Sequence, residues 1–400
     1  MVSADTRPAG GAKPRRQRRK WSRRRRLLIT LAVLLVAGLA GWYRLTLHPG
    51  RVGPARLYQV NGTWVVELAG QPAELGYQHG RLLKHQLKLP FSGHPLGLVA
   101  PWLGHPYERW RLDAPSYEKF IPEHLLEELR GIARGADVDY EDVLVEHTFL
   151  EPLSEPACSF YAVYGGATAD GRLIVGYNLE HHGLIFGERF TMLFDVRPEE
   201  GHRFVSIAWP GFAGSVAAVN DRGLIAVLNN AGTRHFSREG MPYAFLVREI
   251  VQSAGSVDEA MEYLKKAKRT VGNIVLLAQS DPPRAVAAEF DAENIAFREA
   301  EDGVLIATNT FRTLYQTQPL SLADGKDSRY NALLGSIRAN YGHISSEKNF
   351  LNVPGVYQDF GVFSVLFHPG AHRFRLASGR MPAAEQPFRD FTITTEGIGR

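Results

Sequence analysis

A stretch of seventeen uncharged residues, Leu27 to Tyr43, constrains this chain more than any other feature of its sequence. It follows a dense basic run that ends with Arg23 to Arg26, and Arg44 closes it. As a helix rising about 1.5 Å per residue it would span about 26 Å, close to the ~30 Å hydrocarbon core of a bilayer. Trp42 and Tyr43 lie at its far end, where interfacial aromatic residues are typical. We therefore expect a single transmembrane helix that acts as an uncleaved signal anchor.

Two alternatives to the signal anchor remain open. A cleaved signal peptide should end near an A-x-A site, which Ala37-Gly38-Leu39-Ala40 fits poorly. A nucleic-acid-binding arm is disfavoured by charge: residues 1–26 hold eleven basic and one acidic residue, which leaves 35 of the 46 basic and 41 of the 42 acidic residues for the remainder. An acidic body would repel phosphate. The positive-inside rule places the N-terminus in the cytoplasm and residues 45–400 outside it.

Beyond the basic tail (1–26) and the anchor (27–43), composition divides the chain into a linker and two larger parts. Residues 44–58 are predicted to be a linker. Residues 59–157 contain helical patterns at 73–87, 122–135 and 140–147. From residue 158 to 400, short apolar and β-branched runs are separated by Gly, Pro and Asp-Gly turns, with helices between groups of strands. Strands grouped in this way, without βαβα alternation, predict an α+β fold with antiparallel sheets.

The chain has one cysteine, Cys158, at the junction between the helical part and the strand-rich part. A single cysteine excludes an intramolecular disulfide and a cysteine-rich zinc site. The sequence also lacks the G-x-S-x-G, H-E-x-x-H, P-loop and G-x-G-x-x-G motifs. A lone cysteine is most often a small buried hydrophobe. At the start of a strand, however, a thiol can face a cleft, so Cys158 is also a candidate nucleophile.

The residues around Cys158 resemble a known family. The segment Cys158 to Glu180 (CSFYAVYGGATADGRLIVGYNLE) is similar to the nucleophile region of the isopenicillin N acyltransferase-like (acyl-coenzyme A:6-aminopenicillanate acyltransferase-like) family of N-terminal nucleophile (Ntn) hydrolases. Four other segments resemble landmarks of that family in the same order: ELGYQHGRLL (74–83), VNDRGLIAVLN (219–229), GVLIATN (303–309) and DSRYNAL (327–333). The resemblance implies a four-layer αββα sandwich.

The resemblance also implies self-activation. The thiol of Cys158 would attack the carbonyl carbon of Ala157, and water would hydrolyse the resulting thioester. Residue 158 would then carry a free α-amine with a pKa of about 7.7–8.0, which can accept the thiol proton. The α chain (59–157) and the β chain (158–400) of the precursor are expected to stay associated. Ala157 departs from the Gly usual in the family, and the pattern after Cys158 is one residue shorter.

Further site residues are implied by the same match. Asn229 corresponds to the oxyanion-hole Asn, Arg329 to an Arg near the site, and Glu180 to a position usually held by Asp that orients the nucleophile or its amine. Each also has a structural alternative, since a strand-end Asn and a helix Arg are common. Asn178, two residues before Glu180, is predicted to bind substrate or to form local hydrogen bonds.

Trp209-Pro210-Gly211-Phe212 precedes the predicted oxyanion strand, and we expect Trp209 and Phe212 to line a substrate pocket, although such a loop can equally form the edge of a core. His181 and His182 are neighbours on a strand and would point to opposite faces, which argues against a shared metal ion. His79 is predicted to be structural. No metal or cofactor is expected.

These observations predict an extracytoplasmic cysteine amidohydrolase that cleaves an N-acyl amide, such as an acylated amino acid, peptide or lipid. Acyl-coenzyme A is a cytoplasmic metabolite, so hydrolysis is preferred to transfer from that donor. An acyltransferase that passes the acyl group to an amine, and a catalytically inactive membrane-anchored binding domain of the same fold, are the alternatives.

Overall fold

The structure of this chain is a computed structural model that describes residues 47–88, 107–148, 157–181, 187–315 and 327–399. The predicted basic tail and signal anchor, and His182, lie outside these residues. Within the described ranges, no helix combines the length and apolar character needed to cross a bilayer.

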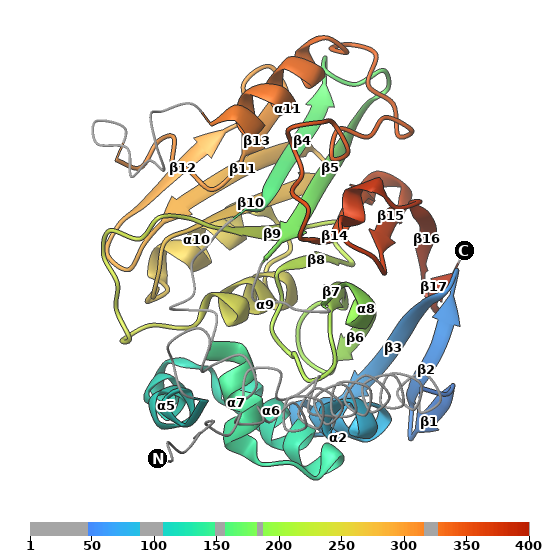
Figure 1. Ribbon diagram of the computed structural model, residues 1–400, viewed down its shortest axis with the longest axis vertical. Helices are drawn as coiled ribbons and strands as arrows, with labels where there is room; N and C mark the ends of the chain where they lie inside the picture. Colours follow the sequence, from blue (N-terminus) through green and yellow to red (C-terminus); the bar gives the residue numbers. More distant parts are fainter. Residues whose placement is uncertain (1–46, 89–106, 149–156, 182–186, 316–326, 400) are drawn as a thin grey trace, which may run out of the picture. The chain divides into compact units, whose positions relative to one another are not determined.

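Two β-sheets form the centre of the fold (Figure 1). The ten-stranded sheet has the order β1 (Gly50–Val52), β2 (Ala55–Val60), β3 (Thr63–Gly70), β6 (Met192–Pro198), β7 (Phe204–Ala208), β8 (Ala217–Asn220), β9 (Ile225–Asn230), β10 (Asn273–Ser280), β11 (Pro283–Phe290) and β12 (Ile295–Glu299). The seven-stranded sheet has the order β13 (Val304–Ala307), β4 (Ser159–Gly165), β5 (Gly171–Glu180), β14 (Gly361–His368), β15 (Arg373–Ser378), β16 (Arg389–Thr394) and β17 (Gly397–Gly399). The predicted α+β class with largely antiparallel sheets is confirmed.

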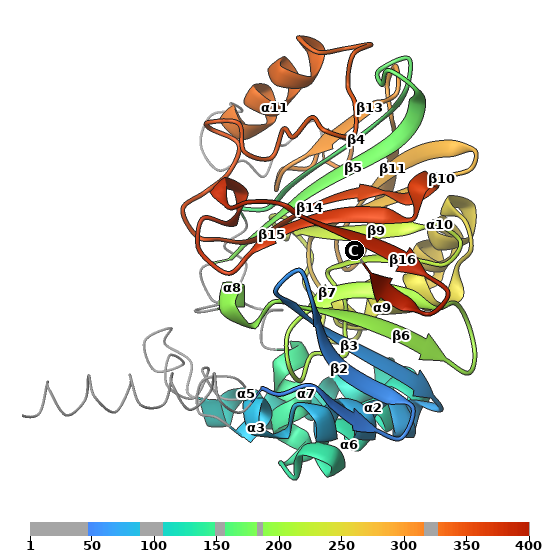
Figure 2. The same cartoon turned by 90° about the vertical axis from the view of Figure 1, so that its right-hand side faces the viewer.

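The sheets pack face to face, with helices on their outer sides (Figure 2). The Tyr177 hydroxyl in β5 donates to the Leu228 carbonyl in β9 at 2.6 Å, which joins the two sheets. Helices α9 (Tyr243–Ser253) and α10 (Val257–Lys266) cover β8 to β11. Helix α11 (Ser328–Arg338) covers the other sheet, because Leu333 and Ile337 pack with Tyr161 in one apolar cluster.

The register of β4 and β5 decides which side chains face which layer. Val163 pairs with Ile174, and Phe160 pairs with Tyr177. Because side chains alternate along a strand, Val163 and Ile174 face α11 with Tyr161, whereas Phe160 and Tyr177 face the ten-stranded sheet. Asp170-Gly171 is one of the Asp-Gly turns that the sequence predicts between strands. It joins β4 and β5 as a hairpin, and Gly171 has the positive φ (+75°) that such turns require.

The segment before Cys158 contributes strands to the fold as well as helices. The linker prediction for residues 44–58 is wrong from Gly50 onward, because residues 50–70 form β1 to β3, and β3 pairs in parallel with β6 of the core. The pattern was obscured by a tight turn at Gly53 (φ +58°) and by charged residues on the exposed side of short strands. The sheet edge therefore belongs to the segment upstream of Cys158.

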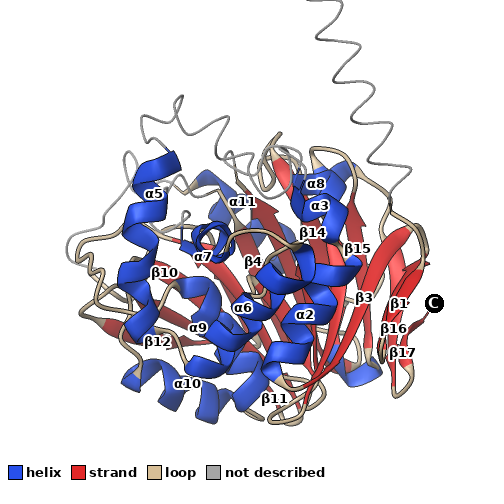
Figure 3. Ribbon diagram, turned by 90° about the horizontal axis from the view of Figure 1, so that it is seen from below, coloured by secondary structure: helices blue, strands red, loops and turns tan. Residues whose placement is uncertain are grey.

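The predicted upstream helices are confirmed, with bounds that differ by a few residues. Helix α2 (Pro72–Leu82) is followed by α3 (Lys84–Lys88), and α6 (Glu123–Ala136) and α7 (Tyr140–Thr148) lie near the predicted positions. Pro72 and the Glu74 carboxylate, which accepts from the Gln71 N–H at 3.2 Å, begin α2. Figure 3, a view from below, shows these helices in front of the sheets together with α5 (Tyr107–Asp113), whereas α8 (Gly187–Phe190) contacts β14.

Four glycines let α2 and α6 approach each other closely. Gly76 and Gly80 on α2 face Gly131 and Gly135 on α6, and a Cβ atom at each would lie 1.9 to 2.6 Å from a backbone oxygen of the partner helix. Real Cβ atoms do not reach such distances, so the crossing depends on the absence of side chains.

We expect Gly131→Ala to lower the free energy of unfolding by roughly 1–3 kcal/mol through overpacking. Its Cβ would lie 2.6 Å from the Ala73 carbonyl oxygen. The matched control is Gly335→Ala in α11, where the new Cβ has open space. This substitution should raise the free energy of unfolding by up to about 1 kcal/mol through helix propensity. Urea unfolding of both variants measures the difference, and equal effects would contradict the packing argument.

Candidate active site

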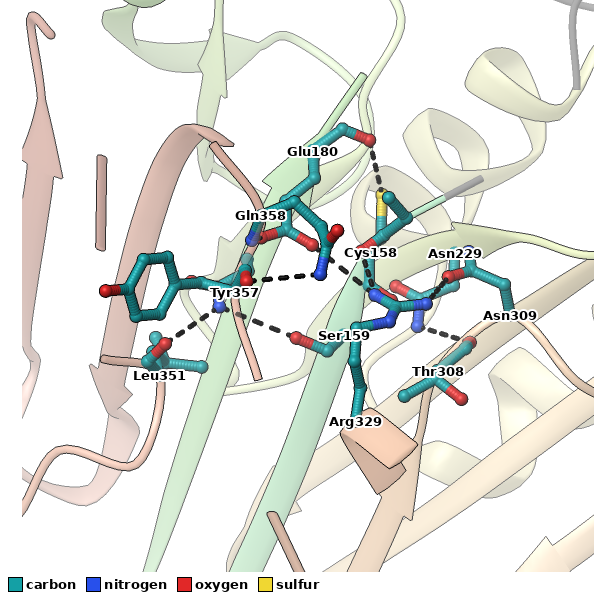
Figure 4. Close-up of polar contacts among 12 residues, drawn as sticks. Cys158, Ser159, Glu180, Asn229, Thr308, Asn309, Arg329, Leu351, Tyr357 and Gln358 are labelled. Carbon is teal, nitrogen blue, oxygen red and sulfur yellow. Dashed lines mark hydrogen bonds and ion pairs between the residues drawn. The ribbon is translucent and has the colours of Figure 1, made fainter. Parts of the chain in front are cut away.

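Cys158 lies directly before β4, buried between the sheets. Its side chain is 2% exposed, and its Sγ donates to the backbone carbonyl of Glu180 at 3.5 Å (Figure 4). The pairing of Ser159 with Asn178 brings this start of β4 beside the end of β5. Burial raises the pKa of the Cys158 thiol to about 11. In the intact chain the sulfur is therefore protonated near neutral pH.

Arg329 in the first turn of α11 joins the residues on either side of the Ala157–Cys158 bond. Its Nη1 donates to the Ala157 carbonyl oxygen and, at 3.1 Å, to the Cys158 carbonyl oxygen. The same nitrogen lies 3.4 Å from Oε2 of Glu180. Asp327 caps the helix by accepting the Tyr330 N–H at 3.0 Å and also accepts a hydrogen bond from the Thr308 hydroxyl, which fixes where the helix begins.

Glu180 is fully buried at the end of β5, and its two carboxylate oxygens contact different elements. Oε2 lies near Arg329, and Oε1 accepts the backbone N–H of Gln358 at 2.5 Å. Burial raises the pKa of Glu180 to about 8, opposed by the Gln358 N–H and by the charge of Arg329.

Asn229 ends up close to the site, but its amide donor is engaged elsewhere in the intact chain. Its Nδ2 donates to the Thr308 carbonyl at 2.7 Å and contacts the Ala307 carbonyl at 3.4 Å. Among the described residues, the donor that contacts the Ala157 carbonyl is instead Arg329. The oxyanion role predicted for Asn229 stays a prediction for the cleaved form.

Asn309 is a site residue to which sequence reasoning assigned no role. Its Oδ1 accepts from Arg329 Nη2 at 2.6 Å, and its Nδ2 donates to the Asn230 carbonyl at 2.7 Å. It therefore connects the guanidinium to the end of β9. The signal was present, because Asn309 closes one of the five segments that resemble the family and directly follows a predicted strand.

Asn178 lies on the α11 side of β5 and has structural partners. Its Oδ1 accepts from the Ser364 hydroxyl at 2.6 Å, and its Nδ2 donates to the Leu351 carbonyl at 3.1 Å (Figure 4). These bonds hold β5 to β14 and to the segment that carries Gln358. This is the local hydrogen bonding that the sequence left open as the alternative to substrate binding.

Trp209 and Phe212 lie in the loop after β7, both buried. Their rings stack at 4.4 Å, and Phe212 also stacks on His147 of α7 at 5.0 Å. These contacts are those of a core edge, and lining a substrate pocket stays a prediction. His79 has the expected structural role, since its Nε2 accepts the Gly211 N–H at 2.9 Å.

The arrangement is suited to acyl chemistry at the Ala157–Cys158 bond. A thiol lies next to a carbonyl whose oxygen accepts from a guanidinium, and a donor placed there stabilises the negative charge that develops on that oxygen during nucleophilic attack. The buried carboxyl group of Glu180 lies 3.4 Å from the same guanidinium nitrogen.

Comparisons with known proteins agree with the sequence resemblance. Residues 168–358 match the family model described as acyl-coenzyme A:6-aminopenicillanic acid acyl-transferase. The match begins ten residues after Cys158, so it includes Glu180, Asn229 and Arg329 but not the cysteine.

A protein of Archaeoglobus fulgidus is 29% identical over an alignment that covers 80% of this chain and 63% of that protein, so the chain spans less than two thirds of this relative. Two solved structures align at low similarity. The Caenorhabditis elegans ortholog of N-acylethanolamine-hydrolyzing acid amidase has a TM-score of 0.43 at 15% identity, over 53% of this chain and 93% of that one. Penicillin V acylase from Agrobacterium tumefaciens has a TM-score of 0.41 at 11% identity, over 60% and 87%.

We expect Glu180→Gln to remove a pH dependence of stability. The folded-state pKa of Glu180, about 8, lies above its unfolded value, so the group stabilises the fold below about pH 4.5 and this contribution is lost as the pH rises through 8. The slope is at most about 1.4 kcal/mol per pH unit. Urea unfolding from pH 5 to 8 should give a flatter profile for the variant, with exposed Glu200→Gln as the control. Parallel profiles for Glu180→Gln and wild type would contradict the assignment.

Proposed function

We propose that this chain, whose residues 168–358 match the acyl-coenzyme A:6-aminopenicillanic acid acyl-transferase family model, is a self-activating cysteine amidohydrolase. Cys158 is the nucleophile, first toward the Ala157 carbonyl of its own chain and then toward the carbonyl of an N-acyl amide. The acyl group passes to sulfur as a thioester, and water releases it.

One observation carries this proposal: the guanidinium of Arg329 donates to the carbonyl oxygen of the residue directly before the only cysteine. In the first step the thiol sulfur adds to the Ala157 carbonyl carbon, and the oxygen that becomes negative is the one that accepts from Arg329. Collapse breaks the C–N bond, the proton that the thiol gave up passes to the departing nitrogen, and the acyl group is left on sulfur as a thioester. Water then frees the Ala157 carboxylate and the α-amine of Cys158.

The freed amine supplies a base next to the thiol. Its pKa of about 7.7–8.0 allows a neutral fraction at physiological pH that can accept the thiol proton. Glu180 and Arg329 would then lie beside the new N-terminus. Arg329 donates to the Cys158 carbonyl oxygen, and the Glu180 carboxylate lies next to the Arg329 guanidinium. Before cleavage the buried, protonated thiol has no such partner, so the precursor is latent.

The substrate class follows from the chemistry and the proposed location. We favour hydrolysis of an N-acyl amide, since an enzyme outside the cytoplasm does not meet acyl-coenzyme A. Release of free acid from a panel of N-acyl amino acids, peptides and amines, measured with and without an added amine acceptor, separates hydrolysis from acyl transfer. A processed protein that turns over none of them would favour the inactive binding domain.

We also propose that residues 27–43 anchor the enzyme with residues 45–400 outside the cytoplasm. The support is the uncharged stretch behind the basic run. Washing membranes with alkaline carbonate tests the anchor, and release of the protein by this wash would contradict it.

The two chains are proposed to stay together after cleavage because the upstream segment is built into the core. Strand β3 pairs with β6, and Glu128 of α6 forms a buried ion pair with Arg248 of α9 at 3.0 Å. Two imidazoles of the upstream segment, His79 and His147, accept the N–H groups of Gly211 and Ala213 at 2.9 and 2.8 Å.

We expect purified protein to yield fragments of residues 1–157 and 158–400, which are 157 and 243 residues long, unless residues before 45 are removed. Intact-mass analysis and N-terminal sequencing measure this. Cys158→Ala should abolish cleavage, and Arg329→Gln should slow it by roughly 10²-fold or more through loss of the oxyanion donor. Arg338→Gln at the other end of α11 is the control. A wild-type chain that stays whole sinks the proposal.

The fragments should co-elute in size-exclusion chromatography near pH 7 and separate in acid. Burial lowers the pKa of His79 to about 3 and of His147 to about 4. Both folded values lie below the unfolded one, so their contribution is complete above about pH 6.5 and is lost as the pH falls toward 4. His147→Gln, whose side-chain oxygen can still accept a hydrogen bond, should shift the acid midpoint downward. A β chain that elutes alone at pH 7 would contradict the association.

A further inference from the structure

Tyr177 is a fully buried tyrosine three residues before Glu180, on the strand β5. Its hydroxyl donates to the carbonyl of Leu228 at 2.6 Å. Leu228 is the residue before Asn229, so the hydroxyl reaches the end of β9 from the strand that carries Glu180.

The strand register places this hydroxyl on the side of the sheet that the thiol faces. Phe160 pairs directly with Tyr177 and faces the ten-stranded sheet. Cys158 lies two residues before Phe160 and therefore shares its face. Continued pairing would set Cys158 opposite Leu179, which makes Tyr177 its diagonal neighbour, a position within reach of a long aromatic side chain. Glu180 and Asn178 have the other parity along β5.

The electrostatics of the two groups agree with this placement. The neighbouring Tyr177 hydroxyl is one of the groups that lower the pKa of Cys158, against the larger effect of burial. Burial, together with the neighbouring thiol, holds the pKa of Tyr177 well above its ordinary value, so the phenol keeps its proton throughout the physiological range. A phenol that keeps its proton is a permanent donor.

Among the described residues, the other groups that contact Cys158 offer the thiolate no such donor. The Glu180 carbonyl accepts from the S–H group and can serve only the protonated thiol, because a carbonyl oxygen has no proton to give. Arg329 Nη1 is occupied by the backbone oxygens of Ala157 and Cys158. A buried thiolate without a donor pays the full penalty of lost hydration.

We propose that Tyr177 is a catalytic residue whose hydroxyl turns from the Leu228 carbonyl to the Cys158 sulfur when the thiolate forms. This inference rests on the proposed function, in which Cys158 is the nucleophile. The thiol proton goes to the α-amine of residue 158 in the mature enzyme, and Tyr177 neither loses nor gains a proton. When sulfur acquires an acyl group and its negative charge is gone, the hydroxyl returns to Leu228.

The single cysteine makes a direct test possible. The full chain labelled with [3-¹³C]cysteine gives one Cβ signal, whose chemical shift follows ionisation of Cys158 during a pH titration. Tyr177→Phe should raise the midpoint by about one to two pH units, the effect of one hydrogen bond to a charged group. Cleavage of the Ala157–Cys158 bond, measured by mass at fixed pH, should slow by about ten- to a hundredfold in parallel.

Tyr161→Phe is the matched control. Tyr161 is a buried tyrosine on the adjacent strand, but its ring packs edge-on against Phe350 at 5.5 Å in the cluster under α11, on the opposite face. It should leave the midpoint and the cleavage rate unchanged. Circular dichroism melting of each variant separates a change of ionisation from a loss of fold.

A substitution in the opposite direction covers the case in which Tyr177→Phe does not fold. Site-specific 3-fluorotyrosine at position 177 keeps the ring and has a more acidic hydroxyl, so it should lower the midpoint. Unchanged midpoints in either folded variant, with a wild type that is cleaved, overturn this inference and leave the proposed function intact. A wild type that is never cleaved refutes the proposed function itself.

Discussion

The hydrogen bonds of the Arg329 guanidinium hold the site together. One of its nitrogens contacts the carbonyl oxygens of Ala157 and Cys158 and lies near Glu180, and the other contacts Asn309. These partners come from the segment before β4, from the end of β5 and from the loop after β13, so one planar cation fixes three elements relative to each other. A guanidinium suits this position because its five N–H groups point in fixed directions and it keeps its charge when partly buried.

In the intact chain the Ala157 carbonyl oxygen already accepts from Arg329, whereas the Cys158 thiol beside it keeps its proton. Burial keeps the thiol of Cys158 protonated, with a pKa of about 11, and also raises the pKa of Glu180 to about 8. Loss of contact with water disfavours the charged form of both groups, so both keep their protons to a higher pH. Cleavage would add an amine at this place and would change the electrostatics without a new fold. In the proposed mechanism the activating chemistry is therefore local.

The segment upstream of Cys158 takes part in the fold as fully as the segment downstream. It contributes the sheet edge through β1 to β3, a helix pair held by four glycines, and two neutral histidines that accept backbone N–H groups of the loop after β7. The cavity beside this loop, lined in part by His79, Glu128 and Arg248, is enclosed by residues from both segments. Such an interface explains why a cut between Ala157 and Cys158 need not separate the two parts.

Local pattern was sufficient for much of the chain. The helices near residues 73–87, 122–135 and 140–147, the turn between β4 and β5 and the α+β class follow from periodicity and turn residues. The family resemblance likewise singled out Cys158, Glu180, Asn229 and Arg329. Short strands such as β1 and β8 were missed because few residues and a tight turn leave no clear alternation. The sequence by itself determined which side chains are available and on which strand faces they lie. Only the tertiary structure decided that Arg329 contacts the Ala157 carbonyl, that Asn309 accepts from the same guanidinium and that the Tyr177 hydroxyl reaches the Leu228 carbonyl, because these partners are distant in sequence and meet only when the two sheets and α11 pack together.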